Sequence, residues 1–297
     1  MNISRISETA HFILTHAERF HLLSSHNDIV NIDTDMGLFS VQKQNIPLTP
    51  FAVVMEDSDS FDQFKYQLTT NVITSIDECK AALIGQLQST AIYSSSLSTQ
   101  NTILIPDLEN LALMITMVLK KEEFPSGLRD FASNITFHKT GLMFHAIEQS
   151  DLEKFIRSKL EGVSLSKLAH PITSLIGLGN GLTPSMDDFL VGLISVFAFF
   201  DNHCELSFHR ELLELTERKR HATNRVSASF LQSAVKHRFA QPVLELYDAF
   251  QSQNLDRIHH ALNRILNIGH TSGSDSLNGI LFGIRLLTEL NPYSDYR

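Results

Sequence analysis

One segment of the sequence combines residue types that bind small anions. Residues 177–188 read GLGNGLTPSMDD and stand directly before the most apolar run of the chain. Thr183 is a favourable helix N-cap and Pro184 suits the first helical position, so we expect a helix from about Pro184 to Phe200. The glycines allow the backbone to approach a ligand closely, and free N–H groups at a helix start attract anions. The segment therefore predicts an anion-binding helix start.

Two adjacent aspartates, Asp187 and Asp188, fall in the first turn of this expected helix. They have a purely structural interpretation, because acids near a helix N-terminus stabilise the helix dipole by about 0.3–1 kcal/mol each. A glycine-rich turn before a buried helix can likewise serve tight packing alone. The segment by itself leaves the functional and the structural interpretations open.

A second segment, residues 269–277, repeats the same polar order before another apolar stretch and reads GHTSGSDSL. Both copies read G-x-T-x-x-x-D. The matched pairs are Gly181 with Gly269, Thr183 with Thr271, and Asp187 with Asp275. Ser272 with Asp275 also fits a capping box. We expect two helix N-termini that converge on one pocket; two unrelated capping sequences are the alternative.

A third segment between these two, residues 223–231, reads TNRVSASFL. Thr223 and Ser227 are four residues apart and would share a helical face, so both hydroxyls are candidates for the same site. Arg225 lies off that face and could bind a phosphate or carboxylate through two hydrogen bonds. Helix packing and a solvated surface arginine are the alternatives.

Composition narrows the class of protein. The chain has 297 residues, 43% hydrophobic and 19% charged, which is typical of a globular protein with one large domain or two smaller ones. A net charge of -9 argues against binding a nucleic-acid backbone or an anionic membrane. The two cysteines, Cys79 and Cys204, indicate a reducing compartment. The N-terminus lacks a signal-peptide pattern, and the apolar run Phe189–Phe200 is too short to span a bilayer, so we expect a cytoplasmic protein.

Other catalytic motifs are missing from the sequence. None of the 14 histidines lies in HExxH, and neither GxSxG nor GxxxxGK[ST] occurs. These absences argue against a zincin, an α/β-hydrolase and a P-loop enzyme. The GLGNGL stretch has no βαβ context, which argues against a dinucleotide site.

The pattern along the chain predicts an α+β fold, with a β-rich region over residues 1–106 and a helical region over residues 107–297 that carries both glycine-rich segments. The predicted strands are RFHLLSS, DIVNID, GLFSVQ and FAVVMED within residues 19–57, and NTILIP at 101–106. One helix is expected around SIDECKAALIGQL. The later segments with helical spacing are DLENLALMITMVLKKEEF, FHAIEQSDLEKFIRSKL, FLVGLISVFAFF, HRELLELTERKR, NRVSASFLQSAVKHRF, PVLELYDAFQ, DRIHHALNRILNI and DSLNGILFGIRLLTEL.

Three segments of the chain resemble the AllH (YlbF-like) family of bacterial proteins. GLGNGLTPSMDDFLVGL is similar to the family's G-x-GLTPS-x-DD segment, IGHTSGSDSLNGILFG to its GHTSG-x-D segment, and VSASFLQSAVKHRFAQPVL to its VS-x-S helix. The resemblance covers about residues 177–285, in the family's order. The sequence departs from the family at three positions. Asn180 stands where proline is usual, Met186 where glycine or histidine is usual, and His237 where glycine is usual.

The resemblance implies a role in purine and allantoin catabolism. The family's named member is a subunit of oxamate carbamoyltransferase, which interconverts oxalurate plus phosphate with oxamate plus carbamoyl phosphate. That subunit works with an FdrA-type partner, which resembles acyl-CoA synthetase subunits, and with a further partner subunit. Because Met186 would narrow access beside the aspartates, the acceptor substrate is not carried over.

This chemistry suits a site made of helix starts, because all four compounds are small anions. Backbone N–H groups could stabilise the charge that develops on the carbonyl oxygen and on the leaving phosphate. Asp187 or Asp275 could accept the proton of the attacking amide if desolvation raises the carboxyl pKa, and His270 is a second candidate base. The expected anion-binding residues are Gly179, Asn180, Gly181, Thr183, Ser185, Asp188, Thr223, Ser227, Thr271, Ser272, Gly273 and Ser274.

Asp188 is assigned to support of these groups or to a divalent cation that accompanies the phosphate, the one cofactor the sequence suggests. Two other function classes stay open. The chain could be a non-catalytic subunit that holds an anion or shapes a shared active site while a partner carries the chemistry. It could also be a metal-dependent hydrolase that uses the three aspartates.

Overall fold

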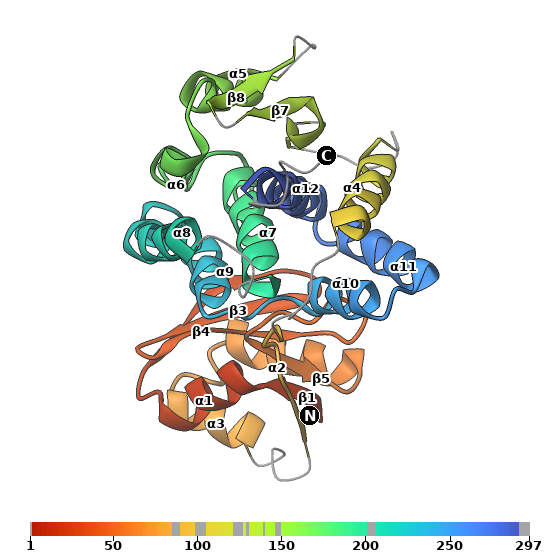
Figure 1. Ribbon diagram of the computed structural model, residues 1–297. Coiled ribbons are helices and arrows are strands. Elements are labelled where there is room, and N and C mark those ends of the chain that lie inside the picture. Colours follow the sequence, from red (N-terminus) through yellow and green to blue (C-terminus); the bar gives the residue numbers. More distant parts are fainter. Residues whose placement is uncertain are drawn as a thin grey trace. The chain divides into compact units, whose positions relative to one another are not determined.

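The fold is α+β, as predicted. The computed structural model describes residues 2–84, 90–98, 105–120, 127–128, 131–138, 140–145, 150–200 and 206–290. The chain divides into two compact units, Met1–Ser95 and Ser96–Arg297 (Figure 1).

The first unit is built on a mixed six-stranded sheet with the strand order β2-β3-β4-β5-β1-β6. The strands are β1 (Ile3–Ser7), β2 (Phe20–Ser25), β3 (Ile29–Thr34), β4 (Gly37–Gln42), β5 (Ala52–Met55) and β6 (Ala91–Tyr93). Strands β2, β3 and β4 form an antiparallel meander, whereas β4 pairs with β5, and β1 with β6, in parallel. The four strands predicted between residues 19 and 57 are confirmed as β2 to β5.

In its described residues, the first unit also contains the helices α1 (Glu8–His16), α2 (Ser58–Thr69) and α3 (Ile76–Ile84). Their apolar side chains share one buried cluster with the sheet, including Phe39 of β4 and Phe61 of α2. Of these helices, only α3 was predicted. Strand β5 ends earlier than the predicted FAVVMED because Asp57 caps α2, accepting a hydrogen bond from the N–H of Ser60.

The second unit is mostly helical, with one antiparallel hairpin formed by β7 (Ile135–His138) and β8 (Gly141–Phe144). Its helices of eight or more residues are α4 (Ile105–Leu119), α5 (Asp151–Leu160), α7 (Ser185–Phe199), α8 (Leu206–Lys219), α9 (Arg225–Val235), α10 (Gln241–Gln251), α11 (Leu255–Leu266) and α12 (Ser272–Leu290). Short helices are η2 (Phe131–Asn134), η3 (Leu165–Lys167), α6 (Ala169–Thr173) and η5 (Arg220–Ala222).

Two sequence predictions in this unit are wrong at their boundaries. The predicted strand NTILIP overlaps α4, because Ile105 and Pro106 open that helix, where proline is tolerated; residues 101–104 lie outside the described part. The helix predicted from residue 144 starts later, because Phe144 ends β8 and Ser150 caps α5 in a capping box with Glu153.

Helices α7 and α12 pack together within this unit (Figure 1). A Cβ on Gly192 would lie 2.1 Å from the carbonyl oxygen of Ser276, and a Cβ on Gly279 would lie 2.0 Å from that of Phe189, so the two backbones touch. Gly283, further along α12, faces Val196. Thr183 contacts Ser272 where the two helices start, and Val196 contacts Gly283 further along both, so their N-termini lie at the same end.

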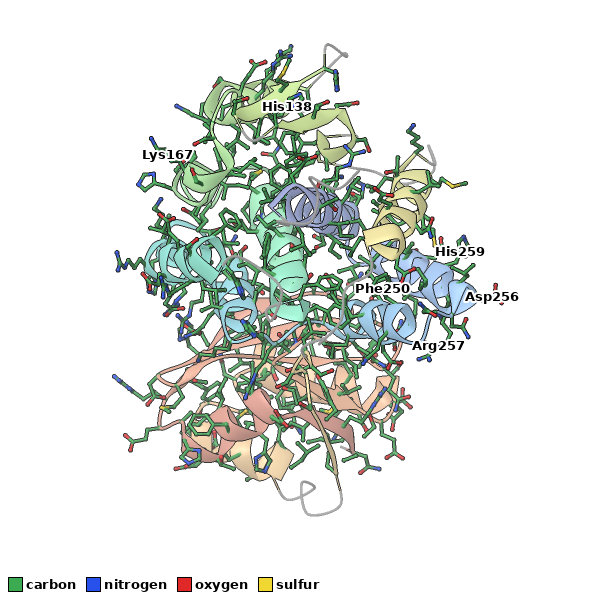
Figure 2. All side chains as sticks on the ribbon, in the orientation of Figure 1. His138, Lys167, Phe250, Asp256, Arg257 and His259 are labelled. Atoms are coloured by element: carbon green, nitrogen blue, oxygen red, sulfur yellow. The ribbon has the colours of Figure 1, made fainter. Side chains whose placement is uncertain are left out.

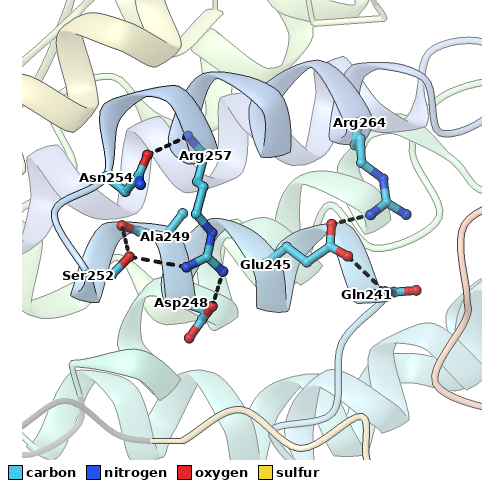
Figure 3. A network of polar contacts seen from close by, with 8 residues as sticks. All are labelled: Gln241, Glu245, Asp248, Ala249, Ser252, Asn254, Arg257 and Arg264. Atoms are coloured by element: carbon cyan, nitrogen blue, oxygen red, sulfur yellow. Dashed lines mark hydrogen bonds and ion pairs between the residues drawn. The ribbon is translucent and has the colours of Figure 1, made fainter.

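The outer helices α10 and α11 are joined by polar pairs (Figure 3). Arg257 forms an ion pair with Asp248, and Arg264 pairs with Glu245, which also accepts a hydrogen bond from Gln241. The exposed side of α11 carries Asp256, Arg257 and His259 (Figure 2). Over the described residues, no helix is both long and apolar enough to cross a membrane.

Candidate functional site

The start of α7 differs from the predicted one by a single residue. Pro184, not Thr183, is the N-cap, with an extended backbone (φ −56°, ψ 142°) and a carbonyl that accepts hydrogen bonds from Asp187 and Asp188 at 2.9 and 3.2 Å. The prediction that Thr183 caps the helix is therefore wrong, because Thr183 lies one residue too early to reach the first-turn N–H groups.

The glycine-rich loop folds back onto this helix start. Gly179 has a φ of +121°, and a Cβ there would lie 2.5 Å from the backbone nitrogen of Ser185. The N–H of Met186 donates to the carbonyl of Leu178 at 3.0 Å. The loop thus uses part of the hydrogen-bonding capacity that we expected to be offered to a ligand. Asn180 and Gly181, at the tip of the loop, are exposed.

The start of α12 lies directly beside that of α7. Ser272 is the first residue of α12, and its hydroxyl shares a 2.8 Å hydrogen bond with the hydroxyl of Thr183. Ser272 is therefore inside the helix and not its cap, so the predicted capping box with Asp275 does not form. The structure brings the two glycine-rich segments together through this pair of hydroxyls.

The other polar residues of the α12 start mainly serve the helix itself. The carbonyl of Thr271 accepts hydrogen bonds from the N–H of Asp275 at 2.9 Å and from the hydroxyl of Ser274 at 2.7 Å. The N–H of Gly273 donates to Ile268. His270 is exposed in the turn before the helix.

Asp187 is held on both carboxylate oxygens by the chain. Its Oδ1 accepts a 2.8 Å hydrogen bond from the N–H of Gly177, and its Oδ2 accepts a 2.6 Å hydrogen bond from the hydroxyl of Ser227. The side chain is buried, at 1% exposure. Asp187 therefore ties the start of α7 to the glycine-rich loop and to α9.

Helix α9 reaches the site through a residue that sequence reasoning missed. Asn224 is its N-cap, accepting from the N–H of Ser227 at 3.0 Å, and the Asn224 amide donates to the carbonyl of Leu182 at 2.7 Å. The preference of asparagine for N-caps was the available signal. Because α9 begins at Arg225, Thr223 lies outside the helix with an extended backbone, and the prediction that Thr223 and Ser227 share a helical face is wrong.

Asp275 is covered by a short segment far away in the sequence. Its Oδ1 accepts a 2.8 Å hydrogen bond from the N–H of Leu128. A Cβ on Gly127 would lie 2.2 Å from the hydroxyl oxygen of Ser185, so the backbone of Gly127 sits against both helix starts. Burial raises the pKa of Asp275 to about 6, although the hydrogen bond from Leu128 opposes this rise.

Asp188 lies between these groups and is the least satisfied of the three. Its carboxyl is buried, and no partner for Oδ2 exists among the described residues. Burial raises the pKa of Asp188 well above its ordinary value; the hydroxyls of Thr183 and Ser272 oppose this rise, whereas the nearby carboxylates of Asp275 and Asp187 add to it. The neutral form of Asp188 is therefore favoured relative to an exposed carboxyl group.

The aspartates do not form a joint metal site in the described structure. Across its residues, no group of three or more histidine, cysteine, aspartate or glutamate side chains is placed to hold a metal ion. Both oxygens of Asp187 already accept hydrogen bonds from the chain, which makes Asp187 a poor ligand for a cation.

The segment that contains these residues also matches a known family. Residues 175–284 match the family model of oxamate carbamoyltransferase subunit AllH. The resemblance seen in the sequence is thereby confirmed over a range that includes the glycine-rich loop, α7, α9 and the start of α12. No solved structure matches the chain. The AllH match supports a carbamoyltransferase subunit in general, and a family of subunits indicates a complex of several chains.

Proposed function

We propose that this chain is a subunit of an oxamate carbamoyltransferase-type complex in purine or allantoin catabolism, and that it binds a small anion of that reaction at the shared start of α7 and α12. The observation that supports this proposal best is the hydrogen bond between Thr183 and Ser272. This hydrogen bond joins the N-termini of two parallel helices, α7 and α12, inside the segment that matches AllH. We place the complex in the cytoplasm.

The electrostatics of the helix starts favour an anion despite three nearby aspartates. Two parallel helices place the positive ends of their dipoles side by side, and each end attracts negative charge. An ionised Asp188 would oppose this attraction, but burial raises its pKa and so favours the neutral form. A neutral carboxyl group can also donate a hydrogen bond to a phosphate or carboxylate oxygen. The free Oδ2 of Asp188 is the atom that we assign to this contact.

Carbamoyl transfer also requires a base, and Asp275 fits that task better than the other candidates. A carboxyl group with a pKa of about 6 is close to the value that a general base needs near neutral pH. Asp187 is committed to two hydrogen bonds with its own chain, and His270 is exposed. In this proposal Asp275 accepts the proton of the attacking amide, and no step uses a cation.

Thermal unfolding with ligands tests the binding part of the proposal. The full chain is melted with phosphate, carbamoyl phosphate, oxamate and oxalurate, and a ligand present at about 100 times its dissociation constant should add roughly 2.7 kcal/mol of stability. The variant Gly181→Val should lose the shift with carbamoyl phosphate, because its φ of +103° disfavours a β-branched residue at the tip of the loop.

Gly162→Val is the matched control. Gly162 also has a positive φ (+74°) and open space around its Cα, but it follows α5 and does not belong to the site. This variant should be strained to a similar degree and still respond to carbamoyl phosphate. The loop around Gly181 does not bind the anion if Gly181→Val keeps the thermal shift with carbamoyl phosphate. The same conclusion holds if Gly162→Val loses that shift together with Gly181→Val.

A second candidate function is that of a non-catalytic subunit, assembled with an FdrA-type partner and a further chain that carry the chemistry. One observation favours it: the chain itself satisfies the N–H groups of Met186 and Gly273 and both oxygens of Asp187, as a scaffold would. Turnover of carbamoyl phosphate by the isolated chain distinguishes the two functions. Turnover that depends on added partner chains supports the assembly subunit, and turnover without them supports the enzyme.

A further inference from the structure

A cavity lies in the helical unit between α4, β7 and α12, with a volume of ≈ 440 Å³. Arg285, which lines it, is ten residues beyond Asp275 on the same helix, or roughly 15 Å along the helix axis. The cavity is therefore distinct from the helix starts. Its volume falls within the range of roughly 300–1,000 Å³ that is typical of sites for small molecules.

Arg285 carries the positive charge of this cavity. Its Nη1 donates to three carbonyl oxygens, those of Ala132 (2.9 Å), Ile135 (3.2 Å) and Ser133 (3.4 Å). Within the described part of the chain, no carboxylate lies at ion-pair distance from Arg285, and burial lowers its pKa. A guanidinium group has five N–H donors on three nitrogens, so Nε and Nη2 remain for a planar anion such as a carboxylate.

The remaining lining is both acidic and apolar. Glu109 of α4 and Glu289 of α12 bring two carboxylates to the cavity. Leu113, Phe137 and Ile284 supply an apolar wall. Leu113 is 59% exposed, which is high for a leucine beside a cavity and leaves apolar surface for a ligand to cover.

We propose that this cavity binds an α-amino acid with an aliphatic side chain. The ligand's carboxylate lies on Arg285, its ammonium group lies on Glu109 and Glu289, and its side chain packs against Leu113. This arrangement gives the half-buried guanidinium the counter-ion that the described chain does not supply, and it places opposite charges together at both ends of the ligand. A simple carboxylate or a simple amine would satisfy only one end.

Calorimetric titration of the full chain with L-leucine tests the proposal, with two analogues that each lack one charged group. 4-Methylpentanoate lacks the ammonium group, and 3-methylbutylamine lacks the carboxylate. Leucine should bind saturably, and each analogue should bind about ten-fold more weakly or worse, because a charge-assisted pair is lost. No heat of binding with leucine, or equal affinities for leucine and 4-methylpentanoate, would overturn the proposal.

Variants locate the binding to this cavity. The double variant Glu109→Gln/Glu289→Gln keeps the size of both side chains and should weaken leucine binding by about ten-fold or more. Glu214→Gln, at an exposed glutamate of α8, is the control and should bind leucine like the wild type. Arg285→Lys should also weaken leucine binding. Arg285 donates hydrogen bonds to three backbone carbonyl oxygens, so its replacement can also disturb the fold. If Arg285→Lys misfolds, the double glutamate variant is the test of the assignment. Wild-type affinity in the double variant would refute the assignment.

Discussion

The contact between α7 and α12 gives the sharpest prediction about how the site is held. Gly279→Ala would place a methyl group 2.0 Å from the carbonyl oxygen of Phe189, within the backbone of the facing helix. Ordinary contact begins near 3.4 Å, so the helices would have to separate locally by about 1.4 Å. Because a backbone carbonyl in a helix cannot rotate away, the strain spreads along both helices.

The expected cost follows from two opposing effects. Overpacking a close-packed interior costs about 1–3 kcal/mol, and a backbone clash falls at the upper end of that range or beyond. Alanine is a better helix former than glycine by about 1 kcal/mol, which offsets part of the cost. Gly279→Ala should therefore lower the free energy of unfolding by about 2–3 kcal/mol. Gly192→Ala, with a Cβ 2.1 Å from the carbonyl of Ser276, should behave in the same way.

Gly283→Ala is the matched control on the same helix. Its Cβ would lie 2.9 Å from Cγ2 and 3.0 Å from Cβ of Val196 and 3.2 Å from Cδ1 of Leu193, a smaller overlap than the 2.0 Å approach to a backbone carbonyl at Gly279. Its stability should stay within about 1 kcal/mol of wild type, because the helix propensity of alanine offsets a milder overpacking. Urea unfolding followed by circular dichroism measures all three variants. Equal stability of Gly279→Ala and wild type, or an equal loss in Gly283→Ala, would show that backbone contact does not hold these helices.

Three further predictions follow from the polar groups of the site. The pKa of Asp275 is raised to about 6 in the folded state, so the unfolded chain loses this proton at a lower pH than the folded chain does. The free energy of unfolding should therefore be highest below about pH 4 and fall by about 3 kcal/mol as the pH rises to 6. Asp275→Asn should lack this fall when unfolding is measured against pH. Ser227→Ala removes the hydroxyl bound to buried Asp187 and should cost about 1.5–3 kcal/mol in urea unfolding, whereas a loss below 0.5 kcal/mol would contradict a structural role of the pair. Asn224→Ala removes a helix cap and the contact with Leu182, so the midpoint of thermal unfolding should fall by the equivalent of about 1–2 kcal/mol, and an unchanged midpoint would argue against the cap.

The sequence predicted those elements whose pattern is local. Strands β2 to β5 alternate or cluster β-branched and aromatic residues between turns, and most helices of the second unit keep their apolar spacing over three turns or more. Strand β1 and helix α1 were missed because the strand has only five residues and the helix follows it at once. Ser7 ends the strand and caps the helix, so neither the strand period nor the helix period of apolar residues is long enough to recognise. The hairpin β7–β8 was missed because its strands, ITFH and GLMF, are as short as β5 but lack the unbroken apolar run of β5, AVVM.

The meeting of the two helix starts could be predicted from the sequence, whereas the contacts of the individual side chains could not. The repeated G-x-T-x-x-x-D order correctly predicted two helix starts that meet, because each copy of this order stands where a helix begins. The roles of individual side chains could not be predicted, since they depend on long-range contacts. Leu128 and Asp275 are 147 residues apart, and no local pattern links the backbone of Leu128 to so distant a carboxylate. The pairing of Asp187 with Ser227 is of the same kind.

Calorimetric titration of carbamoyl phosphate into the wild-type chain and into Thr183→Val tests the central claim most directly. Valine keeps the shape of threonine but removes the hydroxyl that joins the two helix starts at Ser272. Thr69→Val, at an exposed residue of α2, is the control. We expect saturable binding by the wild type and the control, and binding about ten-fold weaker or worse for Thr183→Val. Equal affinity of Thr183→Val and wild type, or no binding by the wild type, would contradict an anion site at the paired helix starts.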